Sequence, residues 1–197
     1  MTPTRCAAHA AAAAFRRCRG LGLSAAGAAV VFLLVGCSVA GGPVRSEAQF
    51  LQHVQETQAA GEDTVRFLGS EPDSVILGKS SSSASCVDDL GMDGDDVNRD
   101  QPSVSWAPDF KDGDAGYRAA VTGLHRRWSA RGWKVTTEPE RDPVTGKATG
   151  LHVINTTDDH GVRLSLSPGR RTGEGLLVAD GGCVRHDGYW DPDDWDL

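Results

Sequence analysis

Several common signatures of enzymatic sites are missing from this sequence. It has no GxSxG nucleophile elbow, no HExxH zinc motif, no P-loop and no GxGxxG turn. The five histidines that follow residue 36 are scattered and lack the spacing of metal ligands: His53, His125, His152, His160 and His186. These absences exclude the motif-defined hydrolases, nucleotide-binding proteins and zinc enzymes, and we expect no metal and no other cofactor.

Acidic residues are absent from the first 36 positions. Residues 1–20 carry four arginines, and residues 21–36 are uncharged and end in an apolar block, Val30–Val35. A membrane-spanning helix needs about 20 apolar residues, so this run is short for a permanent span. A basic start, a short apolar run and small residues predict a secretory signal that is removed as residues 1–36.

The junction between the signal and the mature chain is Leu34-Val35-Gly36-Cys37, which resembles the lipobox of bacterial lipoproteins. The resemblance implies that Cys37 becomes the first residue of the mature chain and carries fatty acids such as palmitate. Two or more acyl chains give stable anchoring, so we expect a lipid-anchored protein on the extracytoplasmic face of the cell membrane. The alternative is an uncleaved signal anchor, in which Cys37 is an ordinary cysteine.

Positive charge is scarce in the predicted mature chain, which has 16 Arg and Lys residues against 27 Asp and Glu. Such a surface repels nucleic acids and anionic lipid headgroups. We therefore expect no nucleic-acid partner, and we expect membrane contact to come through the lipid on Cys37. The preference for Arg over Lys is typical of GC-rich actinobacterial coding.

Cysteine is also scarce, because only Cys86 and Cys183 remain beside Cys37 after the signal is removed. In an oxidising compartment, two such cysteines predict a disulfide. The bridge would close a loop of nearly a hundred residues, for which the chain-entropy model gives about 4–5 kcal/mol. The alternative is two separate buried thiols.

Three segments of the mature chain have too little apolar periodicity to predict a packed element. Residues 37–45 are expected to form a flexible tether, and residues 79–101 a flexible loop that contains the acidic stretch 88–96. A calcium site in that stretch is the alternative to a solvated acidic loop. Residues 188–197 form an acidic tail with three aromatic residues, Tyr189, Trp190 and Trp195. These aromatics are candidates for docking into the groove of a partner or for stacking on sugars. The alternative is a disordered acidic tail or a tail folded back on its own domain.

The remaining residues, 46–187, have the patterns of a single α+β domain. Ser46 and Gln49 are spaced as a capping box and predict an N-terminal helix that ends near Gly61. An apolar stripe predicts an amphipathic helix over 115–131, with Asp112 or Asp114 as its cap: Tyr117, Val121, Leu124 and Trp128.

Period-two alternation then predicts a series of strands. Four follow the amphipathic helix, around residues 133–137, 151–154, 162–166 and 176–178, and a fifth precedes it near Val104 and Trp106. Val75–Leu77 is a candidate for a further short strand. We predict an antiparallel β-meander of four to five strands packed against one amphipathic helix, with an additional N-terminal helix. This order of elements is similar to that of small actinobacterial lipoproteins, with the similarity carried by residues 128–135, 159–164 and 183–184. This similarity implies a fold and a location at the cell membrane, but it implies no enzymatic activity.

Two functions are consistent with these patterns. We favour a non-enzymatic binding or assembly module of the cell envelope, with an envelope protein or glycan as its partner. The alternative is an exported hydrolase or cell-wall enzyme that uses dispersed carboxylates. The enzyme would require a cleft in which two or more of five residues converge: Asp88, Asp89, Asp158, Asp159 and His160.

Overall fold

The computed structural model of the chain describes residues 42–81, Cys86 and residues 98–188. The predicted signal, Cys37, the acidic stretch 88–96 and the three tail aromatics lie outside the described residues. The predictions made for them therefore remain predictions.

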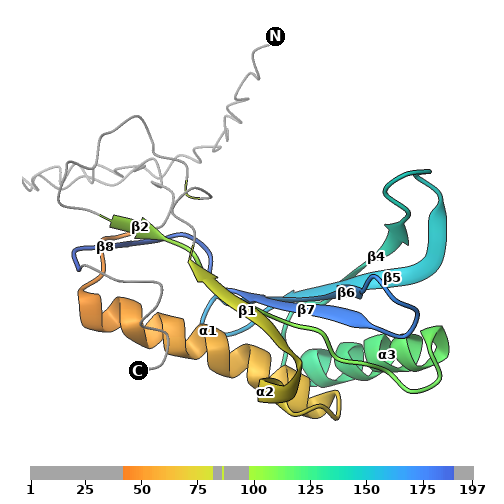
Figure 1. Ribbon diagram of the computed structural model, residues 1–197. Coiled ribbons are helices and arrows are strands. Elements are labelled where there is room, and N and C mark those ends of the chain that lie inside the picture. The colour runs from red at the N-terminus through yellow and green to blue at the C-terminus, as the bar shows by residue number, and fades with distance from the viewer. Residues whose placement is uncertain (1–41, 82–85, 87–97, 189–197) are drawn as a thin grey trace, which may run out of the picture. The chain divides into compact units, whose positions relative to one another are not determined.

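Eleven elements form the described part of the chain (Figure 1). The helices are α1 (Glu47–Phe67), α2 (Pro72–Val75) and α3 (Asp114–Ala130). The strands are β1 (Ile76–Ser81), β2 (Asn98–Asp100), β3 (Pro102–Trp106), β4 (Thr136–Arg141), β5 (Ala148–Thr157), β6 (Arg163–Pro168), β7 (Gly175–Asp180) and β8 (Val184–His186).

Six of the strands form one antiparallel sheet in the order β1-β3-β7-β6-β5-β4, and β2 and β8 pair separately as a small ribbon. The α+β class is confirmed, and so is the antiparallel meander from β4 to β7. The number of strands predicted was too low. Strands β3 and β1 extend the meander beyond β7 through pairings between residues that are far apart in sequence.

One face of the six-stranded sheet carries the hydrophobic core. Ile154, Leu166, Leu177 and Trp106 are cross-strand partners in one row, and each is almost completely buried. Helix α1 contacts β3 and β7, α3 contacts β5, and both helices lie on this face (Figure 1). Two helices therefore cover the sheet, whereas the sequence pattern assigned the covering role to α3 alone.

The N-terminal helix begins as predicted but is longer. The Ser46 hydroxyl accepts the Gln49 N–H at 3.4 Å, and the Gln49 side-chain oxygen accepts the Ser46 N–H at 3.0 Å, which completes the capping box. The helix passes through Gly61 and ends at Phe67. The Gly61 backbone packs against the Trp106 ring so closely that a Cβ would lie 2.2 Å from two ring carbons. This glycine permits a close contact and does not end the helix.

Two other predictions of local structure were wrong at their boundaries. Residues 79–81 and 98–100 were expected in a flexible loop but belong to β1 and β2. Strand β1 lies at the edge of the sheet, and most of its side chains are exposed. Because neither face of the strand is buried, its sequence shows no apolar alternation, and only its backbone pairing makes it a strand. The cap of α3 is Gly113, with φ of 59°, and neither Asp112 nor Asp114 caps it through its side chain.

A charged cluster joins the two long helices. Arg127 on α3 donates hydrogen bonds to both carboxylate oxygens of Asp63 on α1 at 2.9 Å, and Arg131 adds one at 3.0 Å. Burial by itself would raise the pKa of Asp63, but the hydrogen bonds from the two guanidinium groups hold it below its usual value. This contribution to stability is present above the ordinary pKa of aspartate and is lost as the pH falls through the lowered value.

In the described part of the chain, none of the helices has both the length and the apolar character needed to cross a bilayer.

Candidate functional site

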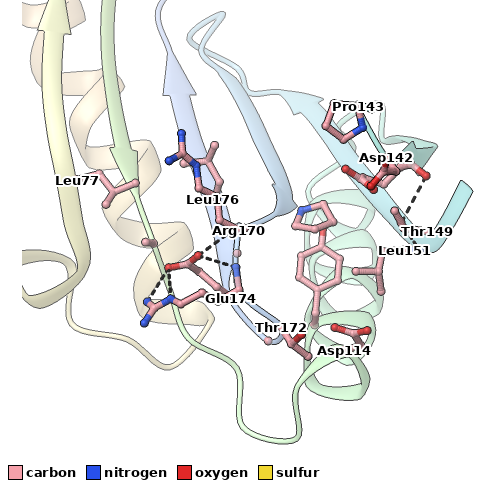
Figure 2. A pocket seen from close by; sticks show the side chains of 18 residues that line it. Leu77, Asp114, Asp142, Pro143, Thr149, Leu151, Arg170, Thr172, Glu174 and Leu176 are labelled. Carbon is pink, nitrogen blue, oxygen red and sulfur yellow. Dashed lines mark hydrogen bonds and ion pairs between the residues drawn. The ribbon is translucent and has the colours of Figure 1, made fainter. Parts of the chain in front are cut away.

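A cleft opens where the β4–β5 hairpin and the β6–β7 hairpin approach the first turn of α3 (Figure 2). Its volume is about 840 Å³. Small-molecule sites commonly enclose about 300–1,000 Å³, so the cleft is large enough for an organic ligand. Three leucines from β1, β5 and β7 contribute apolar surface: Leu77, Leu151 and Leu176.

Tyr117 on α3 also lines the cleft, and its position is fixed by contacts with the sheet. Its phenol donates a hydrogen bond to the His152 carbonyl oxygen at 2.7 Å, and the Leu166 carbonyl oxygen lies 3.3 Å away. Burial raises the pKa of Tyr117, and the nearby Glu140 carboxylate raises it further. The phenol therefore remains protonated at neutral pH and acts as a structural donor rather than as a base.

The wall formed by the β6–β7 hairpin is held in place by its own hydrogen bonds. Glu174 accepts the N–H groups of Arg170 and Arg171 at 3.0 and 3.2 Å, and it forms an ion pair with the Arg171 guanidinium at 2.7 Å. The hydrogen bond from Arg171 holds the pKa of Glu174 below its usual value. The Gly173 carbonyl oxygen accepts the Phe110 N–H at 2.6 Å, which fastens the hairpin to the segment before α3.

The opposite wall, the β4–β5 hairpin, turns around Asp142. One Asp142 carboxylate oxygen accepts the N–H of Val144 at 3.0 Å and both the N–H and the hydroxyl of Thr145, at 2.6 and 2.9 Å. These hydrogen bonds, the one from the Thr145 N–H foremost, hold the pKa of Asp142 below its usual value. Asp142 therefore stabilises the turn as an ionised carboxylate.

Three other charged side chains in the cleft do not form hydrogen bonds within the hairpins as Glu174 and Asp142 do. Among the described residues, the carboxylates of Asp114 and Glu140 and the guanidinium of Arg170 have no hydrogen bond or ion pair. They come from α3, β4 and the β6–β7 hairpin, respectively. The cleft therefore combines apolar surface with available charges of both signs.

Comparison of the chain with models of protein families, with curated proteins and with solved structures yields no match.

Among the described residues, none of the candidates predicted for catalysis lines this cleft. Asp158, Asp159 and His160 lie together in the β5–β6 turn, and Asp88 and Asp89 lie outside the described residues. One Asp158 carboxylate oxygen accepts the N–H groups of His160 and Val162 at 2.9 and 2.8 Å. The carboxylate therefore stabilises its own turn.

Two of the histidines are buried and make structural contacts. The His186 Nε2 atom lies 2.9 Å from a carboxylate oxygen of Asp100, and the ring stacks on Phe50 at 4.0 Å between centroids. The His53 Nε2 atom lies 2.8 Å from the Gly181 carbonyl oxygen. Within residues 42–81, Cys86 and 98–188, no three His, Cys, Asp or Glu side chains are grouped closely enough to hold a metal ion.

The predicted disulfide is confirmed. Cys86 and Cys183 form a disulfide bond with a Cα–Cα distance of 5.5 Å. Cys183 immediately precedes β8. The bridge ties the segment between β1 and β2 to the C-terminal part of the chain.

Sequence reasoning identified none of the available charged groups in the cleft. The strands predicted around 133–137 and 151–154, and around 162–166 and 176–178, indicated the two hairpins, but not that their walls would approach each other. That approach depends on the sheet order and on the contact between Phe110 and Gly173.

Proposed function

We propose that this chain is a lipid-anchored, extracytoplasmic binding module of the cell envelope, and that its ligand occupies the cleft between the β4–β5 and β6–β7 hairpins. The observation that carries the binding role is the cleft itself. It joins leucine side chains to two carboxylates and one guanidinium that have no described partner. A short peptide, or a wall fragment that bears one, combines ammonium, carboxylate and apolar groups and is complementary to this lining.

The cleft walls support binding rather than chemistry. Asp142 and Glu174 are ionised and engaged in their own turns, and the Tyr117 phenol is held by main-chain acceptors. The hydrogen bonds within each hairpin restrict the conformations of the cleft walls, which reduces the ordering that binding requires.

The anchoring part of the proposal is tested by labelling cells with an alkyne analogue of palmitate. We expect the full-length chain to take up the label and to sediment with membranes, because the thiol of Cys37 carries the acyl chains. Cys37→Ser should lose the label and leave the membrane fraction. The control is Cys18→Ser, which changes a cysteine of the predicted signal. This variant should retain the label and should still sediment with membranes. Labelled, membrane-bound Cys37→Ser would refute the anchoring.

The binding part is tested by titrating the protein with soluble peptide-bearing wall fragments, followed by native mass spectrometry and calorimetry. We expect Glu140→Gln to weaken binding about tenfold, because a hydrogen bond to a charged group contributes about 1.5–3 kcal/mol. Leu151→Ala should weaken binding by a similar factor through the loss of apolar contact.

The controls are substitutions of similar residues that lie on the same strands as Glu140 and Leu151 but do not line the cleft. Glu138→Gln on β4 and Val153→Ala on β5 remove the same kinds of group and should leave the affinity unchanged. Equal losses in the cleft and control variants would place the ligand elsewhere. No binding of wall fragments by the unmodified protein would refute this ligand class without bearing on the anchoring.

A further inference from the structure

The charges that line the cleft differ in sign and in exposure. Four carboxylates and two guanidinium groups line it, so negative charge is in excess. Arg171 and Glu174 form an ion pair with each other. Among the described residues, the carboxylates of Asp114 and Glu140 have no hydrogen bond or ion pair and are partly buried, whereas the equally unengaged guanidinium of Arg170 is exposed (Figure 2). The cleft is therefore anionic inside and cationic at its rim.

Tyr117 shows that the two carboxylates lie around one point of the cleft. Asp114 is three residues before Tyr117 on α3, and side chains three apart on a helix are neighbours. Burial raises the pKa of Tyr117, and the charge of Glu140 raises it further, so Glu140 lies within electrostatic reach of the phenol. The phenol donates its hydrogen bond to the His152 carbonyl oxygen and therefore neutralises neither carboxylate.

A cation and an anion of a ligand are favoured at different places in this cleft. The two carboxylates are partly shielded from water, so they attract an ammonium group more strongly than fully exposed carboxylates would. They repel an acidic group at the same place. The backbone of Arg170 is fixed, because its N–H donates to Glu174 at 3.0 Å, and a guanidinium can donate two parallel hydrogen bonds to one carboxylate. The charges therefore discriminate between the two ends of a ligand.

We propose that the cleft selects a short basic peptide and binds it in one orientation. A basic side chain of the peptide lies between Asp114 and Glu140, its free carboxyl terminus lies at Arg170, and an apolar side chain contacts Leu151 and Leu176. This inference rests on the binding role proposed above and specifies the chemistry of the ligand. An acidic peptide is rejected, because it would place like charges together at the partly buried carboxylates.

The test uses four synthetic tetrapeptides based on acetyl-Ala-Lys-Ala-Ala. The lysine amine is free or acetylated, and the carboxyl terminus is free or amidated. Binding to the protein is measured by calorimetry and native mass spectrometry. We expect lysine acetylation to weaken binding about tenfold. Amidation should weaken it about threefold, because the exposed guanidinium of Arg170 is well solvated. A fifth peptide with glutamate in place of lysine should bind more weakly than all four.

Variants of the protein assign each effect to one part of the cleft. In the double variant Asp114→Asn, Glu140→Gln, lysine acetylation should change the affinity by no more than about twofold, whereas amidation should keep its full effect. In Arg170→Gln, amidation should lose its effect and acetylation should keep it. The controls are Glu138→Gln on β4 and Arg118→Gln on α3, which remove exposed charges that do not line the cleft. Both controls should retain both effects.

Four outcomes separate this inference from the binding role on which it rests. Effects of acetylation and amidation that persist unchanged in the cleft variants would overturn the orientation, and so would preferred binding of the glutamate peptide. Wall fragments that bind while the free peptides do not would also overturn this inference, but would leave the binding role in place. Peptides that bind with the expected pattern while wall fragments do not would support the basic-peptide class and exclude the wall as its source. Circular dichroism confirms that each variant has folded.

Discussion

Replacing both Cys86 and Cys183 with alanine is expected to lower the free energy of unfolding by about 2–5 kcal/mol. The bond joins residues 97 positions apart, so its loss releases a large loop in the unfolded chain. The chain-entropy model alone gives about 4.7 kcal/mol for a loop of this size. Because a domain of this size is stable by about 5–15 kcal/mol, the variant should lose a large share of its free energy of unfolding. Urea denaturation followed by circular dichroism measures the difference.

Reduction of the unmodified protein provides an independent measurement. Reduced protein and the double alanine variant should have nearly the same midpoint in urea, because both lack the same link. The reducing agent should not change the midpoint of the alanine variant. A variant as stable as the oxidised protein would show that the bond contributes nothing to stability.

Gly61→Ala is expected to lower the free energy of unfolding by about 1–3 kcal/mol, because the added methyl group overpacks the core. Its Cβ would lie 2.2 Å from two carbons of the Trp106 ring and 3.1 Å from the Ala179 Cβ. Trp106 is almost completely buried on β3, between β1 and β7, so the ring cannot move aside without displacing its neighbours. Thermal and urea denaturation report the loss.

A matched substitution on the other long helix separates this clash from helix propensity. At Gly123 on α3, an added Cβ meets only the Phe67 ring at 3.6 Å, an ordinary contact. Gly123→Ala should therefore stabilise the protein by up to about 1 kcal/mol, the gain in helix propensity. In addition, Trp106→Phe removes the clashing carbons, so it should be less destabilising in the Gly61→Ala background than alone. Additive effects would contradict the proposed contact.

Local patterns in the sequence predicted the elements whose own side chains form a periodic face. The stripe through Tyr117, Leu124 and Trp128 predicted α3 to within one residue at each end, because those side chains are the buried ones. Alternation likewise located β6, and the apolar run Leu176–Val178 located β7. The capping box located the start of α1, since both of its hydrogen bonds lie within four consecutive residues.

Other features could not be predicted because their causes are distant in sequence. In the sequence, Gly61 indicates the end of a helix. In the structure, it lies inside α1 because its missing side chain makes room for the Trp106 ring. The segment Gly-Lys-Ser-Ser of β1 has no apolar alternation, and it is a strand only because its backbone pairs with β3. Glu140 and Arg170 resemble ordinary surface charges until their hairpins are placed on either side of one cleft.

The amino-acid sequence by itself determined the α+β class, the meander from β4 to β7, the capping box and the pairing of the two cysteines. These follow from local periodicity, from a four-residue hydrogen-bonding motif and from cysteine count. Only the tertiary structure decided the six-strand order, the cleft and the contact between the Asn98 side chain and Gly188. Each of these depends on contacts between residues far apart in the chain, and no local preference of the residues involved encodes them.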